Sequence, residues 1–259
     1  MRKISDYLGC DAGDLWREES DNGILQILRD EKEARISGGL YHELQVRMAY
    51  NSNRIEGSQL TECQTRQIFE TNTIDVGDAV SVDDILETVR HFRAIDYVID
   101  TAEEELSEAI IKHLHYILEH DTKESTLSWF AVGDYKRRAN MAGGREPVKP
   151  KDVPERMKAL LVDHNAKDTV TVHDVIALHA EFEHIHPFQD GNGRVGRLIA
   201  LKECLRHNII PFFIEDSKKS FYYRGLSQWR NEKGWLTDTC LDGQDTFILL
   251  LDMLDISHE

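Results

Sequence analysis

The most informative stretch of the sequence is HPFQDGNGRVGR, which occupies residues 186–197. Apolar residues recur at helical spacing both before and after it, so we expect a loop that joins two helices. Pro187 and Gly191 prevent the first helix from continuing through the stretch. The second helix is expected to begin near Asn192 or Gly193. Because the stretch combines a histidine, an aspartate and two arginines, which are side chains typical of catalytic sites, residues 186–197 are called the catalytic loop.

The rest of the chain also has the apolar spacing of helices. Ser81, Ser107 and Thr171 each precede such a run in the position of an N-cap. A further helix is expected over about residues 40–57, with a glycine at its end. Proline is scarce, with 5 in 259 residues, and no stretch alternates apolar and polar side chains well enough for a large sheet. We therefore predict an all-α fold.

The composition narrows the class of protein. Lysine and arginine number 31 against 47 aspartates and glutamates, and this net charge of −16 argues against a general nucleic-acid binder. No apolar run approaches the roughly 20 residues that cross a membrane, and the first residues lack the apolar core of a secretion signal. The four cysteines form no CxxC pair. We expect a cytoplasmic protein without nucleic-acid or membrane partners.

The glycines of the catalytic loop make it a candidate anion site. A glycine-rich loop that opens a helix offers free backbone N–H groups and the positive end of the helix dipole, and both attract phosphate. Arg194 and Arg197 share a helix face near that end, because they are three residues apart. Two guanidinium groups suit a polyphosphate chain better than a single carboxylate.

Asp190 and His186 supply further groups that phosphate chemistry needs. A carboxylate beside bound phosphates requires a cation between them, and Mg²⁺ accepts one carboxylate together with phosphate oxygens. An imidazole titrates near neutral pH, so His186 is a candidate base. Each feature alone also has an ordinary structural interpretation, such as a helix-end histidine or a turn. Their occurrence in one loop favours the chemical interpretation.

Other phosphate and metal motifs fit the sequence less well. Gly191, Gly193 and Gly196 match the dinucleotide-binding pattern GxGxxG, but no strand is expected before them and no βαβ repeat follows. The chain contains no GxxxxGK[ST] motif of a P-loop. The histidines between residues 173 and 186 lack the HExxH spacing of metal hydrolases.

Residues 133–150 differ from the rest of the acidic chain because they are basic. Gly143 and Gly144 form a hairpin-turn signal within them. One interpretation is a solvated surface loop. The other is a short β-hairpin flap beside a site that handles negative charge, and the neighbouring phosphate-type loop favours it.

The catalytic loop resembles the Fic family signature HPFx[D/E]GNGRxxR at every specified position, and the similarity extends from about Leu40 to the C-terminus. The resemblance implies a Fic-type helical bundle with one short β-hairpin flap, which transfers AMP from ATP to a protein hydroxyl. It implies His186 as the general base and Asp190 as the ligand of Mg²⁺ or Mn²⁺. The other implied nucleotide contacts are Gly191, Asn192, Gly193 and Arg194 around an anion, Arg197 on the terminal phosphate, and Tyr222 and Tyr223 beside the nucleotide.

The segment Ser52-Asn-Arg-Ile-Glu56-Gly57 resembles the inhibitory motif of the family, [S/T]xxxE[G/N]. On the residues alone it is a helix C-terminus with a glycine cap. Beside a complete Fic signature, the resemblance implies that the Glu56 carboxylate pairs with Arg197. The guanidinium would then be withheld from the γ-phosphate, and the α-phosphorus of ATP would be badly placed for attack.

The resemblance also divides the chain into parts. Residues 1–37 are expected to form an N-terminal helical extension, and residues 38–259 the Fic core. The core would contain the inhibitory helix at about 40–57 and the flap at about 133–150. The flap is expected to hold the main chain of a target protein as an added strand. Its edge toward the active site is expected at Ala139, Asn140, Met141 and Ala142.

The leading hypothesis is a self-inhibited protein adenylyltransferase that modifies a Ser, Thr or Tyr hydroxyl of a protein, including itself. A second hypothesis is the removal of AMP from a modified protein, with Glu56 activating water. A third is a regulatory or toxin–antitoxin-like module whose Fic site is not catalytic. The expected partner is a protein that presents a hydroxyl in an extended segment, and a homo-oligomer remains open.

Overall fold

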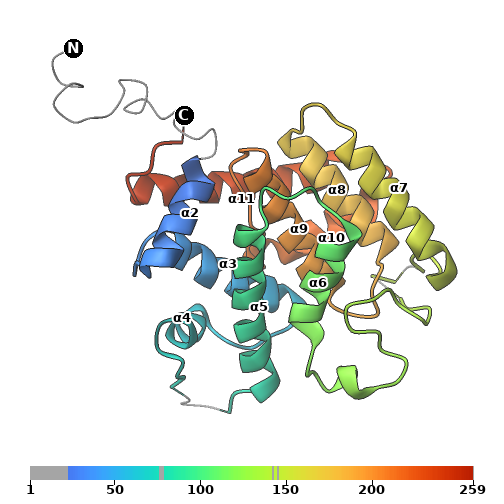
Figure 1. The fold of residues 1–259 in the computed structure, drawn as a ribbon, viewed down its shortest axis with the longest axis horizontal. Coiled ribbons are helices and arrows are strands. Elements are labelled where there is room, and N and C mark those ends of the chain that lie inside the picture. The colour runs from blue at the N-terminus through green and yellow to red at the C-terminus, as the bar shows by residue number, and fades with distance from the viewer. Residues whose placement is uncertain (1–22, 76–78, 142, 145, 259) are drawn as a thin grey trace, which may run out of the picture.

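The computed structural model describes residues 23–75, 79–141, 143–144 and 146–258. These residues form α-helices joined by loops and three short 3₁₀ turns (Figure 1). The helices are α2 (Gly23–Ala34), α3 (Leu40–Glu56), α4 (Glu62–Thr71), α5 (Val82–Asp100), α6 (Glu108–Glu119), α7 (Val153–Asn165), α8 (Val172–Ile185), α9 (Asn192–Arg206), α10 (Lys219–Gln228) and α11 (Gly234–Met253). The 3₁₀ turns cover Glu124–Thr126, Pro150–Asp152 and Asp216–Lys218. The predicted all-α class is confirmed for the described residues.

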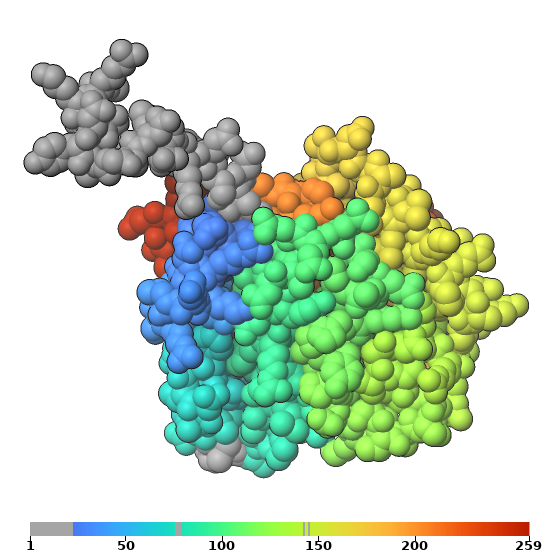
Figure 2. All heavy atoms as spheres, in the orientation of Figure 1, coloured from blue at the N-terminus to red at the C-terminus, as the bar shows by residue number. Residues whose placement is uncertain are grey.

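Helix α9 lies near the centre of the fold. Of its 15 residues, only Gly193 and Arg206 are not buried. A helix that is covered on all sides needs neighbours around it, and α3, α5, α6 and α8 pack against it. Figure 1 shows α9 in orange near the middle of the molecule, and in Figure 2 the green middle part of the chain covers the centre of this face. The loop that begins α9 is therefore attached to a central element.

Apolar side chains from the surrounding helices meet α9 in one core. Each of them stabilises the fold by roughly 1.5–3 kcal/mol when it is fully buried. Examples are Leu44 from α3, Ile95 from α5, Leu114 from α6, Phe182 from α8 and Leu198 from α9 itself. Helix α3, which carries the predicted inhibitory residue, is thus an integral part of the core.

Helix boundaries follow the predicted caps. The Ser107 side chain accepts a hydrogen bond from Ile110 N at the start of α6. Thr171 and Asp174 form a capping box before α8, in which each side chain accepts from the backbone of the other. Gly57 follows α3 with a left-handed φ of 116°, as expected for a glycine at this position.

Part of the predicted N-terminal extension, residues 1–22, lies outside the described residues. Helix α2 lies in the described part of the extension and contacts α3 and α5. Ile24, Leu25 and Leu28 of α2 are buried in the main core. None of the helices that the structure describes is both long enough and apolar enough to span a membrane.

The predicted β-hairpin is wrong for the described part of residues 133–150, which contains no strand. Gly143 and Gly144 do form a turn, with φ of 54° and 78°. A hairpin needs paired backbone groups on both sides of its turn, but Lys136 N instead donates to Pro187 O at 2.9 Å. Two prolines later in the segment also remove N–H donors. The described part of the segment is therefore bonded to the catalytic loop through its backbone.

Candidate active site

The catalytic loop turns at two residues with left-handed backbone. His186 follows α8 with φ of 52°, and Gly191 precedes α9 with φ of 72°, where a glycine is favoured. Asn192 pins the loop between them. Its Oδ1 accepts from Phe188 N at 2.8 Å, and its Nδ2 donates to Phe188 O at 3.0 Å. The Asn192 side chain therefore maintains the shape of the loop from inside.

Phe188 anchors the catalytic loop in the core. Its side chain is fully buried and stacks on the ring of His115 from α6, with ring centroids 4.0 Å apart. Burial lowers the pKa of His115 to about 3, so the ring packs as a neutral aromatic group. His115 Nδ1 also accepts from Gly133 N at 2.9 Å. Helix α6 therefore joins the catalytic loop to the beginning of the predicted flap segment.

A cavity of about 470 Å³ lies beside the start of α9. Small-molecule sites usually enclose roughly 300–1,000 Å³, so this cavity has the size of a ligand site. The predicted site residues that line it are Glu56, His186, Asp190, Gly191, Asn192, Gly193, Arg197, Tyr222 and Tyr223. Arg194, which was predicted as a nucleotide contact, is not among its described lining residues.

His186 lies close to a carboxylate that the sequence analysis did not single out. Glu183 precedes it by one turn of α8, and the Glu183 Oε2 atom is 3.9 Å from His186 Nδ1. A carboxylate on this side favours the tautomer with its proton on Nδ1, which leaves Nε2 to accept a proton. The available sequence signal was the spacing, because an acid three residues before the histidine lies on the same helix face.

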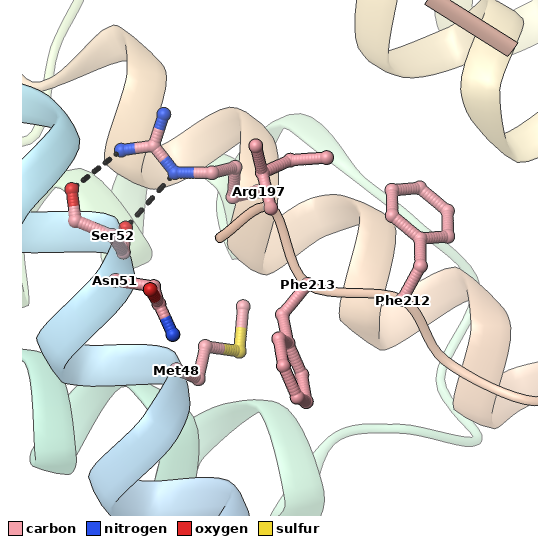
Figure 3. A pocket seen from close by; sticks show the side chains of 7 residues that line it. Met48, Asn51, Ser52, Arg197, Phe212 and Phe213 are labelled. Carbon is pink, nitrogen blue, oxygen red and sulfur yellow. Dashed lines mark hydrogen bonds between the residues drawn. The ribbon is translucent and has the colours of Figure 1, made fainter. Parts of the chain in front are cut away.

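Arg197 is held by the last turns of α3. Its Nε donates to Ser52 Oγ and its Nη2 donates to Ser52 O, both at 3.0 Å (Figure 3). Nη2 also donates to Glu56 Oε1 at 2.7 Å. Met48 and Phe213 line a void of about 10 Å³ beside these bonds, which is room for about one water molecule. Hydrogen bonds to Ser52 therefore hold the guanidinium against α3, and Glu56 contacts it at the cavity.

The ion pair between Glu56 and Arg197 is the contact that the family resemblance predicted. The Glu56 side chain is 33% exposed and lines the cavity. Burial opposes its ionisation, but the Arg197 guanidinium holds the pKa of the Glu56 carboxyl below its usual value. Gly193 leaves room for the contact, because a methyl group there would overlap Glu56 Oε1. An ionised carboxylate therefore occupies part of the donor surface of Arg197.

The two tyrosines line the cavity in different ways. Tyr222 is buried, and its hydroxyl oxygen lies 2.8 Å from His179 Nε2. Tyr223 is 43% exposed, and its hydroxyl donates to Ile55 O at 3.2 Å. Burial raises the pKa of Tyr223 to about 12, so the hydroxyl stays protonated and can donate. Tyr223 is thus linked to the last turn of the helix that carries Glu56.

The four predicted docking residues do not share one environment. Asn140 Nδ2 donates to Phe188 O at 3.1 Å and to Gln189 O at 3.3 Å, so this side chain is bonded to the catalytic loop. Lys136 Nζ donates in turn to Asn140 Oδ1 at 2.9 Å. The other three are Met141, which is exposed and lines the cavity, Ala139, which is exposed, and Ala142, which lies outside the described residues.

Arg194 is buried with acidic partners from two other helices. Its Nη2 donates to Glu119 Oε1 at 2.8 Å, and its Nη1 lies 3.7 Å from Glu87 Oε2. Burial raises the pKa of the Glu119 carboxyl to about 7, although the Arg194 charge opposes this shift. Sequence reasoning missed Glu119. The available signal was its position with His115 on the otherwise apolar face of α6.

Asp190 has the chemistry that a hard divalent cation requires at the cavity. Its carboxylate is exposed and lines the cavity, and its Oδ1 accepts from Gly191 N at 2.7 Å. Mg²⁺ binds one or two carboxylates together with phosphate oxygens and water. Asp190 and a bound nucleotide would supply this donor set, and the cation would neutralise phosphate charge.

Another group of metal-type ligands lies at the far end of α9. His164, Glu203 and His207 place their ligand atoms within 4.8 Å of one another. Glu203 Oε1 already accepts from Lys202 Nζ at 3.1 Å, and Glu203 Oε2 lies 2.8 Å from His164 Nε2. The Glu203 carboxylate is therefore already paired with Lys202 in the core, and we assign these residues a structural role.

Comparison with known proteins agrees with this geometry. Residues 105–204 match the sequence model of the Fic/DOC family. The chain belongs to the Fic/DOC family. The matched range begins before α6 and ends within α9, so it contains the whole catalytic loop.

Protein adenylyltransferases named Fic are similar to this Fic/DOC protein. Those of Drosophila melanogaster and Drosophila sechellia are each 32% identical to it over 184 residues. The similarity covers 68% of this chain and 36% of each relative. The chain therefore spans about a third of the length of these curated relatives.

Solved structures resemble the fold beyond the family match. A Fic domain-containing signaling protein from Bacteroides thetaiotaomicron has a TM-score of 0.72 at 26% identity, and the likeness covers 93% of this chain and 96% of that one. Fic-1 from C. elegans has a TM-score of 0.70 at 19% identity, with 91% and 73% covered. The second likeness concerns the fold alone. The N-terminal helices and the Fic/DOC region thus form one arrangement that related chains share.

Proposed function

We propose that this Fic/DOC protein is a self-inhibited protein adenylyltransferase. It would move AMP from ATP to a Ser, Thr or Tyr hydroxyl of a protein, including itself. The observation that carries the proposal is the single cavity lined by His186, Asp190, Gly193 and Arg197. The similarity to protein adenylyltransferase Fic of Drosophila favours AMP transfer over other phosphate chemistry.

The groups of the cavity suit each step of AMP transfer. The hydroxyl oxygen forms a bond to the α-phosphorus of ATP while the bond to the bridging oxygen breaks, so that pyrophosphate leaves. His186 accepts the hydroxyl proton, and the Glu183 carboxylate, 3.9 Å from Nδ1, would stabilise the positive charge that the imidazole gains. Backbone N–H groups at the start of α9 and the Arg197 guanidinium stabilise negative charge on the leaving phosphates. Mg²⁺ or Mn²⁺ held by Asp190 would neutralise more of that charge.

Glu56 would inhibit this reaction by competing for Arg197. The γ-phosphate of ATP and the Glu56 carboxylate need the same guanidinium, which donates to Glu56 Oε1 at 2.7 Å. Helix α3 is buried in the core, so relief of inhibition would involve its last turn rather than departure of the helix. A protein segment that presents a hydroxyl would enter the cavity beside the exposed Met141.

One observation also supports the removal of AMP as a second candidate function. The Glu56 carboxylate is 33% exposed in the same cavity as His186. From there it could take a proton from a water molecule that attacks the phosphorus of an AMP-modified protein. Transfer and removal would then differ in whether Glu56 blocks Arg197 or activates water.

The test of transfer uses purified Glu56→Gly protein with labelled ATP and Mg²⁺. We expect self-labelling that His186→Ala abolishes while ATP affinity stays nearly unchanged, because phosphate contacts come from the backbone and Arg197. His173→Ala removes an exposed histidine from the same helix as the matched control and should retain the label. If ATP affinity falls as far as the rate, His186 is a structural residue.

Two further measurements separate the candidate functions. A lysate incubated with the Glu56→Gly protein and labelled ATP should show a labelled target band. Removal of that label by wild-type protein, but not by the Glu56→Gly variant, would favour the second function. If no variant labels itself or another protein, the chain is a binding module and the proposal fails.

A further inference from the structure

The Glu119–Arg194 pair is buried more deeply than the Glu56–Arg197 pair. The side chains of Arg194 and Glu119 are 6% and 4% exposed, and their Nη2 and Oε1 atoms are 2.8 Å apart. Glu56, the acid of the other pair, is 33% exposed. A buried ion pair is sensitive to loss of one partner, because the remaining charge has no solvent to stabilise it. The Glu119–Arg194 pair is therefore suited to a permanent contact.

Glu119 contacts the catalytic loop on both sides of the helix start. Arg194 lies in the first turn of α9, and Gly191 is the residue before that helix. A Cβ atom at Gly191 would lie only 2.6 Å from Glu119 Oε1, so the carboxylate rests directly against this backbone. One side chain of α6 thus contacts both the residue before α9 and the first turn of that helix.

The same face of α6 also holds the earlier part of the loop. His115 lies one turn before Glu119 and stacks on Phe188 at 4.0 Å. Phe188 in turn exchanges two hydrogen bonds with the side chain of Asn192, the first residue of α9. Helix α6 therefore contacts the catalytic loop at its entry and at its exit.

Arg194 would leave the acidic side chains of Glu119 and Glu87 without their cation if it turned toward a phosphate. Glu87 Oε2 lies 3.7 Å from its Nη1, and the charge of Asp190 also acts on Glu119. Arg194 is, moreover, not among the described residues that line the cavity. The energy needed to separate this pair would oppose nucleotide binding rather than support it.

We propose that Glu119 is a positioning residue that holds Arg194, and that Arg194 binds no phosphate of the nucleotide. The pair fixes the start of α9 against α6. It thereby places the backbone N–H groups of the loop and, one turn later, Arg197. Of the two arginines in the signature, only Arg197 meets phosphate. The statement about phosphate rests on the proposed function, because it assumes that ATP binds in the cavity. The positioning role of the Glu119–Arg194 pair does not depend on that assumption.

The first experiment compares the two arginines by ATP affinity. Arg197→Ala and Arg194→Ala are each introduced into the Glu56→Gly protein, and Kd for ATP is measured by calorimetry. We expect Kd to rise at least tenfold for Arg197→Ala and by a clearly smaller factor for Arg194→Ala, because the second change disturbs the phosphate-binding backbone but removes no phosphate contact. A rise for Arg194→Ala as large as that for Arg197→Ala would overturn the proposal.

The second experiment separates positioning from binding by steady-state kinetics in the same background. Relative to the parent Glu56→Gly protein, Glu119→Ala and Arg194→Ala should each lower kcat at least tenfold and should change KM for ATP by the same factor as each other, because both disturb the same part of the loop. The double variant should lose no more than either single variant, because both remove the same contact. Glu119→Gln keeps a hydrogen-bond acceptor and should recover part of kcat. Glu87→Gln is the matched control on the weaker partner and should stay near the parent. Additive losses would contradict the proposal.

The third experiment needs neither ATP nor activity. Amide hydrogen exchange at residues 188–195 should be at least tenfold faster in Glu119→Ala than in Glu87→Gln. If Glu119→Ala does not fold, Glu119→Gln is measured instead and should still exchange faster than Glu87→Gln. Equal exchange in folded variants would refute the positioning role. If no variant transfers AMP, the proposed function fails, while the exchange result still decides this inference.

Discussion

The two arginines of the catalytic loop lie three residues apart on α9, but their surroundings differ. Arg197 is bonded to α3 through Ser52 and Glu56 and lines the cavity. Arg194 is bonded to α6 through Glu119 and lies in the core. Their spacing in the sequence puts both near one end of one helix. The neighbouring helices decide which guanidinium can meet a ligand.

The acidic residues of the two ion pairs also differ in solvent exposure, and the more exposed one belongs to Arg197. Glu56 has access to water, whereas Glu119 has almost none. An exposed carboxylate that loses its partner is stabilised by solvent, so the pair is easily exchanged. A buried carboxylate has no such replacement. The first pair therefore suits a reversible contact that regulates a site, and the second suits a fixed contact that shapes it.

Removal of the divalent cation should produce the largest loss of activity. It should affect the nucleotide site that Arg197 lines but not the buried Glu119–Arg194 pair. In the Glu56→Gly protein, we expect Asp190→Ala or EDTA to lower self-labelling at least a hundredfold, because the phosphate charge is no longer neutralised. The melting temperature should stay unchanged in EDTA, since the Glu119–Arg194 pair needs no metal. Asp168→Ala removes an exposed carboxylate as the control. Full labelling in EDTA would remove Asp190 from the metal role.

Release of Glu56 should raise labelling by about ten- to hundredfold. A charge-assisted contact between Arg197 and phosphate is worth roughly 1.5–3 kcal/mol, which corresponds to that range. Arg197→Ala should not mimic Glu56→Gly, because it removes the phosphate partner together with the inhibitory contact. The double variant should stay poorly active, so the two changes are non-additive. Equal labelling by wild type and Glu56→Gly at matched ATP and Mg²⁺ would exclude self-inhibition.

Histidines buried around the two arginines should make the fold less stable in acid. Burial, together with the charges of Arg197 and Arg194, lowers the pKa of His91 to about 3. Burial likewise lowers the pKa of His115 to about 3 and that of His179 to about 4. In the unfolded chain a histidine binds a proton below about pH 6.5. The unfolded state therefore binds more protons below that pH, and stability that is present at neutral pH is lost as the pH falls.

Urea unfolding at pH 7 and pH 5 measures this loss. Each histidine contributes up to about 1.4 kcal/mol per pH unit below pH 6.5, or about 2 kcal/mol by pH 5. His91→Leu replaces one ring with an apolar side chain that does not titrate, so its loss of stability should be smaller than that of wild type by this amount. Equal losses in the two proteins would show that His91 is protonated in the native state.

The helices could be predicted because their signals are local. Ser107 and Thr171 bond to backbone groups within three residues, and Gly57 ends α3 through its own conformation. The catalytic loop could be predicted for the same reason, because most of its chemical groups are contiguous in the sequence. The prediction of a hairpin at Gly143 and Gly144 was wrong because a turn signal does not specify whether the residues on either side of it pair as strands.

The ion pairs of the site could not be read from spacing. Glu119 and Arg194 are 75 residues apart, and no local pattern relates them. Glu56 and Arg197 are 141 residues apart, and their pairing was expected only because a family motif supplied it. Contacts between distant helices depend on how the core packs. The reactive groups of the loop can therefore be predicted from the sequence, whereas the side chains that position them cannot.

Tyr223→Phe should give the smallest effect and the finest test of how Glu56 is held. The Tyr223 hydroxyl donates to Ile55 O at 3.2 Å, one residue before Glu56. A hydrogen bond of this kind contributes about 0.5–1 kcal/mol, so its loss should loosen the last turn of α3 and raise wild-type self-labelling about two- to fivefold. In the Glu56→Gly protein the same change should have no effect, because no carboxylate remains to be positioned. Tyr116→Phe removes an exposed hydroxyl from α6 as the control. A drop in labelling in both backgrounds would instead mean that the Tyr223 hydroxyl contacts the nucleotide rather than positioning Glu56.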